Sequence, residues 1–225
     1  MCGFVRNVID SPEVQKLLIK VGLGDLVGRM RGGRSYLRQT LHDHVIATST
    51  LLHLRDAVWW YAMKPEQGRY VPNWDITSFN ARNLDSRLWR NAIKQRRGLV
   101  IVDTLGESQP VPNRKTPNKF LMESSEPMLI GTVFKEWDDG TLSAAVITRD
   151  PHPAFAQFHE KSMPLFLPPE KEFVSLWLNP GIESHPEIDR VLNESWLYYD
   201  LNVTRVDTYK NAKPLSESVL IPKDD

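Results

Sequence analysis

Short apolar segments, each bounded by glycine, proline or a charged residue, dominate the middle of the chain. Residues 98–103, 127–134 and 143–149 read GLVIVD, PMLIGTVF and SAAVITR, and each has the length of a core strand. Segments with helical periodicity flank this region, and strands and helices do not alternate regularly along the chain. This order is typical of an α+β fold rather than of a parallel sheet built from βαβ units.

The flanking segments supply further expected elements. Ser11 and Pro12 are a favourable helix cap and first helical residue, and apolar residues from Val14 to Val21 follow at helical spacing. Composition and periodicity also predict helices over residues 84–95, 169–178 and 185–195, and strands over residues 44–54, 57–62 and 200–206. Among these strands, 57–62 is expected to pair with 44–54.

Composition indicates one ordinary globular domain. Apolar residues make up 41% and charged residues 25% of the 225 residues, and no repeat or low-complexity linker divides the chain. We therefore expect a single domain over residues 1–225. No stretch approaches 18 uninterrupted apolar residues, and the N-terminus lacks an apolar run of signal-peptide length. These features predict a cytoplasmic protein that does not insert into a membrane.

The distribution of charge is more informative than its sum. Basic and acidic residues each number 28, so no global basic field indicates a nucleic-acid partner. Residues 82–97 nevertheless contain six basic side chains and one acid, and a second basic cluster covers residues 29–38. Such patches fit a phosphate backbone along one face, although solvated surface charge is the commoner explanation. Arg87 and Arg38 are the candidate DNA contacts in the two clusters.

Two groups of rings have more than one interpretation. Trp59 and Trp60 lie next to each other, and we expect Trp59 in the core and Trp60 as a candidate for stacking on a base. His42 and His44 would lie on one side of a strand and could form half of a metal site. Since no third ligand is evident nearby, no metal and no cofactor are expected.

Cys2 is the only cysteine, which excludes an internal disulfide framework and a cysteine-based zinc site. A small second residue permits removal of Met1, and this would leave Cys2 with a free α-amine and a thiol on adjacent carbons. Such a 1,2-aminothiol condenses with an aldehyde to an imine, which the thiol closes to a thiazolidine. The simpler alternative is a small residue that serves only to allow Met1 removal.

Four ordered motifs make the chain resemble the SRAP family, the SOS response-associated peptidases. They are MCG at residues 1–3, FNAR at 79–82, the D-x-x-x-E element from Asp103 to Glu107, and FHEKSMP at 158–164. The resemblance implies a central, barrel-like mixed sheet flanked by helices. It also implies binding of single-stranded DNA at abasic sites without a cofactor or an obligate protein partner.

The resemblance further assigns roles to individual residues. Cys2 would form a thiazolidine crosslink with the opened abasic sugar, after exposure by Met1 removal or autoprocessing. Glu107 and His159 would move protons, Asn80 would hold the N-terminal amine, and Arg82 would bind a flanking phosphate. Asn80 is also a candidate cap for the helix that follows.

Two other classes of function stay open. The family usually has arginine at the position of Phe4, and this and other altered DNA-contacting positions permit a non-catalytic DNA-binding relative. Glutamine amidotransferase domains also begin with MCG and use Cys2 through its own amine, so an N-terminal-nucleophile hydrolase is the second alternative. Covalent trapping of DNA, salt-dependent binding alone, and glutaminase activity would distinguish the three.

Overall fold

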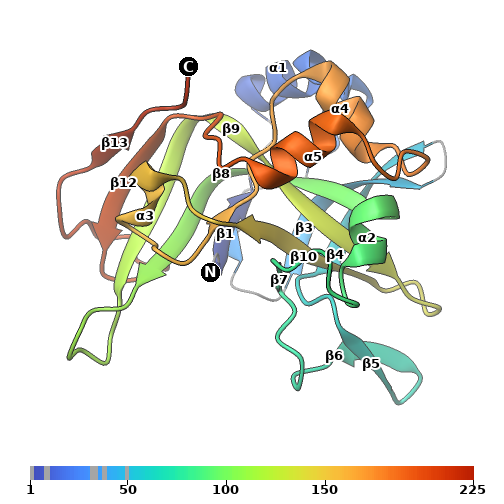
Figure 1. The fold of residues 1–225 in the computed structure, drawn as a ribbon, viewed down its shortest axis with the longest axis horizontal. Helices are drawn as coiled ribbons and strands as arrows, with labels where there is room; N and C mark the ends of the chain where they lie inside the picture. The colour runs from blue at the N-terminus through green and yellow to red at the C-terminus, as the bar shows by residue number, and fades with distance from the viewer. Residues whose placement is uncertain (1–2, 8–10, 31–34, 37–39, 49–50) are drawn as a thin grey trace.

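The computed structural model describes residues 3–7, 11–30, 35–36, 40–48 and 51–225 (Figure 1). Its helices are α1 (Pro12–Lys20), α2 (Arg90–Gln95), α3 (Pro153–Ala156), α4 (Lys171–Leu178) and α5 (Pro186–Asn193), with a 3-10 turn at Gly24–Leu26. Its strands are β1 (Phe4–Asn7), β2 (Ser35–Tyr36), β3 (Thr40–Thr48), β4 (Leu51–Val58), β5 (Met63–Glu66), β6 (Arg69–Pro72), β7 (Asn80–Ala81), β8 (Arg97–Gln109), β9 (Asn118–Glu136), β10 (Leu142–Arg149), β11 (Met163–Pro164), β12 (Leu201–Val206) and β13 (Val219–Ile221).

A large mixed sheet curls into a barrel-like ring. Among the described residues, the path of neighbouring strands runs β13-β12-β9-β10-β4-β3-β8-β1-β2, and β8 also pairs with β9. The ring is not fully closed, because β4 meets β10 only at Val58 and Ser143. The expected α+β class with a barrel-like core flanked by helices is therefore confirmed. A separate hairpin, β5–β6, projects at the lower right of Figure 1.

The two faces of the central strands enter two different cores. Val100 and Val102 of β8 point into the ring with Met128 and Ile130 of β9. Leu99 of β8, like its neighbour Ile101, points the other way, toward the helices. Because side chains alternate between the faces of a strand, a strand buried on both faces is apolar at most positions. This explains the uninterrupted apolar segments that mark the middle of the sequence.

The helices α1, α4 and α5 lie together over one face of the sheet (Figure 1). The Ser11 hydroxyl accepts a hydrogen bond from the Val14 amide at 3.4 Å, and Val14 and Leu18 are buried, as the cap and spacing predicted. Trp177 of α4 is fully buried and its indole donates to the Gly98 carbonyl of β8 at 2.9 Å. The helical layer is thus attached to the strand that carries the site.

Two expectations about local structure are wrong. Residues 44–54 form parts of two strands, β3 and β4, which pair with each other, and β4 ends at Val58, so 57–62 is not the partner strand. This reversal is not evident in the sequence, because residues 44–54 contain no glycine, proline, asparagine or aspartate. The helix expected over 84–95 begins only at Arg90, since residues 83–89 form successive turns.

Gly98 lies at a close approach between β8 and β3. A Cβ atom there would lie 2.5 Å from His44 Nε2 and 3.0 Å from the Val45 carbonyl oxygen. Both neighbours are held in the core, where His44 Nε2 contacts Thr132 Oγ1 at 2.5 Å. We therefore expect Gly98→Ala to lower the free energy of unfolding by about 1–3 kcal/mol in urea denaturation. Gly24→Ala, where the nearest atom would lie 4.0 Å away, is the matched control and should be nearly neutral.

Within the described part of the chain, no helix has the length and apolar character needed to cross a membrane.

Candidate active site

A β-bulge in β8 directs Glu107 into the ring. The pairing of β8 with β9 shifts register between Val102 and Thr104, so the phase of the alternating side chains changes there. Before the bulge even-numbered residues face the ring interior, and after it Leu105 does. Glu107, two residues beyond Leu105, therefore shares its face, and it lies opposite Phe120 of β9. The Glu107 side chain is fully buried.

His159 reaches the same point from another part of the chain. It follows α3, where the His152 ring caps the first turn by accepting from the Ala154 amide at 3.2 Å. Phe158 fixes the next turn by packing edge-on against Phe120, with ring centroids 5.2 Å apart. The His159 Nδ1 atom then lies 2.7 Å from the Ser108 carbonyl oxygen and 3.8 Å from Glu107 Oε2.

Burial determines the charge of both groups. Loss of hydration raises the pKa of Glu107 to about 8 and lowers the pKa of His159 below its usual value. At pH 7 the carboxyl group is therefore mostly protonated and the imidazole neutral, so the 3.8 Å separation is not an ion pair. The imidazole donates its Nδ1 proton to Ser108, and this leaves Nε2 as the basic nitrogen. The site thus holds one proton donor and one proton acceptor.

The first described residues of the chain lie beside Glu107. β1 pairs antiparallel with β8, and Phe4 stands opposite Gly106. In this register Gly3, the residue before β1, continues toward Glu107. Cys2 and Arg38 fall outside the described residues, so their placement is not part of this geometry.

Asn80 lies on β7, which pairs in parallel with β10. Its expected role as a helix cap is wrong, because the next helix, α2, begins only at Arg90. β10 also pairs with β11, the strand that follows the His159 loop. Asn80 and that loop are therefore attached to the same strand.

Arg82 braces the loop that carries His159. Its guanidinium donates to the Lys161 carbonyl and to the Asp150 carboxylate. Lys161 is two residues beyond His159, so this contact restrains the turn below the imidazole. A phosphate bound by Arg82 would have to share the guanidinium with Asp150 or replace it. Arg82 therefore has a positioning role that the sequence did not indicate.

The aromatic candidates divide between core and surface. Trp59 is fully buried, as expected, and its indole donates to the Phe79 carbonyl at 2.7 Å. Trp60 is only 8% exposed, donates to the Asn73 carbonyl and packs against Trp74, which is 62% exposed. In this arrangement Trp74 is the solvent-exposed ring and Trp60 packs against it.

Sequence reasoning also missed a cationic and aromatic group beside Glu107. Lys119 of β9 lies opposite Ser108, with its amino group 5.8 Å from the centre of the Tyr209 ring. Tyr209 stacks on Phe4, with centroids 5.0 Å apart. Only strand pairing brings these residues together, since they are distant in sequence. Arg87, in contrast, lines a groove with α2 and the last residues of β9.

Candidate metal ligands do not gather into a cluster in the described part of the chain. No group of three or more histidine, cysteine, aspartate or glutamate side chains is placed there to hold an ion. His44 is buried, and burial lowers its pKa to about 3, so it stays neutral in the core beside Thr132.

Solved structures with this architecture have very different sequences. A protein from Bacteroides thetaiotaomicron is 14% identical, with a TM-score of 0.63 and coverage of 92% of this chain and 93% of its own. A phage-related protein from Bordetella bronchiseptica is also 14% identical, with a TM-score of 0.62 and coverage of 97% and 100%. A second protein from that organism is 15% identical, with a TM-score of 0.58 and coverage of 92% and 100%.

Comparison at the level of sequence gives two results. No curated protein sequence matches the chain significantly. A family model described as SOS response associated peptidase (SRAP) matches residues 40–212, which is more than half of the chain and includes Glu107 and His159. The chain therefore belongs to the SRAP family.

Proposed function

We propose that this protein binds single-stranded DNA at abasic sites and forms a covalent thiazolidine with the lesion through Cys2. Family membership suggests an abasic-site DNA-binding protein. The observation that carries the proposal is the buried pair of Glu107 and His159, 3.8 Å apart, beside the strand that begins at Phe4. An aldehyde that reached this point would meet one proton donor and one proton acceptor.

The chemistry requires removal of Met1 and a balanced condensation. The Cys2 amine attacks C1′ of the ring-opened deoxyribose, and the resulting carbinolamine loses its hydroxyl as water to give an imine. The thiol then adds to the same carbon, and its proton passes to the nitrogen to complete the thiazolidine. Because an α-amine has a pKa of about 7.7–8.0, a useful fraction is neutral and nucleophilic near pH 7.

Glu107 and His159 divide the proton transfers in this proposal. The protonated Glu107 carboxyl donates to the departing hydroxyl, since burial keeps its proton at pH 7. His159 Nε2 accepts a proton from the attacking amine or opens the sugar ring. Asn80 holds the amine. Where residues precede Cys2, the same groups would assist the autoprocessing step.

DNA-binding roles remain part of the proposal. Arg82 and Arg38 contact phosphates near the lesion, and Trp60, through the exposed Trp74 that it supports, provides a surface for base stacking. Residues 1–225 act as one domain, and the protein works in the cytoplasm, where single-stranded DNA is accessible.

Intact-protein mass spectrometry tests the proposal. The purified protein is measured before and after incubation with single-stranded DNA that carries one abasic site. We expect loss of Met1 and a covalent adduct with the mass of protein plus DNA minus one water. Cys2→Ser, which retains an amine and a hydroxyl, should give no stable adduct.

Each alternative predicts a different result. A processed protein with a free Cys2 amine that forms no adduct, yet binds the DNA in a salt-dependent manner, would identify a non-catalytic relative. Release of ammonia from glutamine would identify an N-terminal-nucleophile hydrolase. If Met1 persists, the processed form is prepared by specific cleavage of a fusion before the same measurement.

A further inference from the structure

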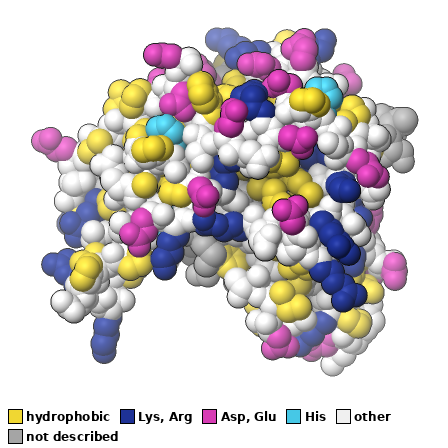
Figure 2. Space-filling view, viewed as in Figure 1, with side chains coloured by type: hydrophobic (Ala, Val, Ile, Leu, Met, Phe, Trp, Pro, Cys, Tyr) yellow, Lys and Arg dark blue, Asp and Glu magenta, His cyan; other side chains and the backbone are white. Residues whose placement is uncertain are grey.

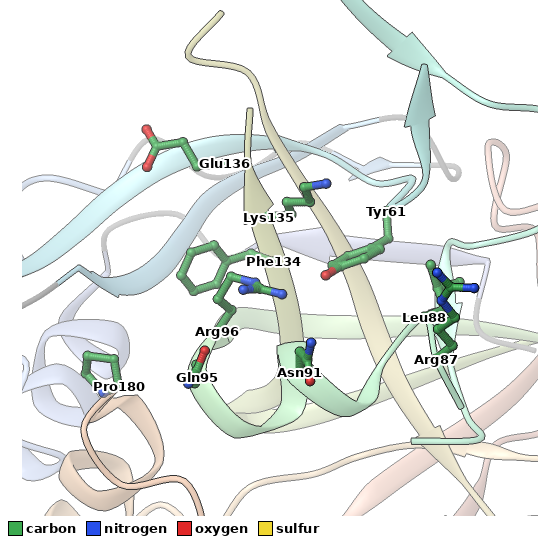
Figure 3. A pocket seen from close by; sticks show the side chains of 10 residues that line it. All are labelled: Tyr61, Arg87, Leu88, Asn91, Gln95, Arg96, Phe134, Lys135, Glu136 and Pro180. Carbon is green, nitrogen blue, oxygen red and sulfur yellow. The ribbon is translucent and has the colours of Figure 1, made fainter. Parts of the chain in front are cut away.

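A polar groove lies at the opposite end of β8 from Glu107. It has a volume of about 540 Å³ and is formed by α2, the last residues of β9 and Pro180, which lies between α4 and α5 (Figure 3). The lining side chains are mostly polar or cationic: Tyr61, Arg87, Leu88, Asn91, Gln95, Arg96, Phe134, Lys135, Glu136 and Pro180. Figure 2 shows Lys and Arg side chains gathered over α2 and the segment before it.

Two of its cations, Lys135 and Arg96, affect each other, and the Lys135 ammonium lies 3.5 Å from the centre of the Trp137 ring. Burial lowers the pKa of Lys135, and the positive charge of Arg96 lowers it further. Arg96 Nε is buried and has no hydrogen-bond partner among the described residues. Figure 3 shows the Arg96 guanidinium, the Tyr61 hydroxyl and the Asn91 amide pointing toward the same space. Neighbouring like charges are stabilised by an anion that binds between them.

The acids near the groove do not neutralise it. Glu136 is bound by Arg55 at 2.5 Å, so this carboxylate is already paired on the outer side of β9. Gln95 donates to Glu183 at 2.8 Å, which holds that carboxylate at the edge of α2. Asp138 is close enough to favour the charged form of Lys135. Arg87, Arg96 and Lys135 therefore leave the groove with a positive balance.

The groove is separate from the Glu107 site. Arg96 immediately precedes β8, whereas Glu107 is the eleventh residue of that strand. At a rise of about 3.3 Å per residue, ten residues span up to about 33 Å along the strand. One DNA strand of about ten nucleotides at the spacing of a stacked helix covers that length.

We propose that the groove of Arg87, Arg96 and Lys135 binds phosphodiester groups of the same single-stranded DNA, several nucleotides away from the lesion. The inference rests on the proposed function, because that function supplies the DNA strand. A guanidinium and an ammonium bound to phosphate oxygens give sequence-independent contacts, which suits a protein that must hold any strand beside an abasic site. The buried rings of Tyr61 and Phe134 form the floor of the groove and are not available for stacking.

Binding of undamaged DNA tests the groove independently of the chemistry. Fluorescence anisotropy would compare single strands of about 6 and about 20 nucleotides, of which only the longer can span both sites. We expect the double variant Arg96→Gln, Lys135→Gln to bind the longer strand about tenfold more weakly, with the salt slope reduced by about 1.4 for two lost phosphate contacts. The shorter strand can still bind at the Glu107 site alone, so its binding should fall by less than the binding of the longer strand.

Matched variants keep the test decisive. Lys94→Gln removes a charge from the same helix on the side away from the groove and should bind like the wild type. Arg87→Gln changes an exposed side chain that no fold contact requires, so it reports on the groove even if the double variant unfolds; about a threefold loss is expected. Equal losses for both lengths, or for Lys94→Gln, would overturn the inference. Absence of an abasic-site adduct with a normal groove effect would instead refute only the proposed function.

Discussion

Replacing Glu107 by glutamine is expected to slow thiazolidine formation by about 10²–10⁴-fold, the usual contribution of a positioned acid or base. Glutamine keeps the size and polarity of the side chain but cannot donate a proton to the departing hydroxyl. The rate would be measured as adduct formed with time on abasic single-stranded DNA, at saturating DNA. Binding of undamaged DNA should remain within about twofold of the wild type, since Glu107 is buried and touches no proposed phosphate contact.

The pH dependence of the rate also tests whether Glu107 is the proton donor. A carboxyl group with a pKa of about 8 is protonated below pH 8 and loses its proton above it. The wild-type rate should therefore fall by about tenfold per pH unit above pH 8, and Glu107→Gln should lack that decline. Glu66→Gln, which changes an exposed glutamate of the separate β5–β6 hairpin, is the control and should keep both rate and profile. A Glu107→Gln variant that reacts at the wild-type rate would remove Glu107 from the mechanism.

The same substitution slows the reaction but is expected to increase the stability of the folded protein, relative to the wild type, as the pH rises. In the unfolded chain a glutamate titrates near its ordinary value of 4.5, whereas burial raises the pKa of folded Glu107 to about 8. Between these values the folded protein holds a proton that the unfolded chain releases. The contribution of Glu107 to the free energy of unfolding is fully present below pH 4.5 and is lost as the pH rises to 8. At about 1.4 kcal/mol per pKa unit, the shift from 4.5 to about 8 corresponds to a loss on the order of 5 kcal/mol.

The difference between wild type and Glu107→Gln isolates this effect. Buried His44 titrates in the other sense: its pKa of about 3 lies below that of an unfolded histidine, so its contribution is present above pH 6.5 and lost on acidification. Both proteins share that contribution, and it cancels in the difference. In urea denaturation from pH 5 to 8, the free energy of unfolding of Glu107→Gln should rise by several kcal/mol relative to that of the wild type. A constant difference across this range would show that Glu107 titrates normally.

The expected effects on rate and on stability together indicate that Glu107 serves the reaction at a cost to the stability of the folded protein. Burial makes the ionised form of the Glu107 carboxyl group unfavourable, so the group stays protonated at neutral pH. Proton donation requires this protonated state. A variant that is more stable at pH 8 and slower in the chemical step is the usual result of relieving such strain. If Glu107 had only a structural role, Glu107→Gln would lower the free energy of unfolding without changing the reaction rate.

The sequence by itself determined the fold class and many of its elements. Apolar segments at 98–103, 127–134 and 143–149 lie in β8, β9 and β10, because strands buried on both faces are mostly apolar. The Ser11–Pro12 pair started α1 where local hydrogen bonding predicts a start. The motifs around Glu107 and His159 led to the SRAP family, since short ordered motifs survive when overall identity is low.

Only the tertiary structure decided where the functional side chains point. By simple alternation from Val100 and Val102, Glu107 would face away from the ring; the bulge before Thr104, visible only in pairing with β9, turns it inward. The burial of Trp60 beneath Trp74 and the contact of Arg82 with the His159 loop also depend on segments distant in sequence. Local propensity fixes which residues form a strand, but register and packing between strands fix which face each residue occupies.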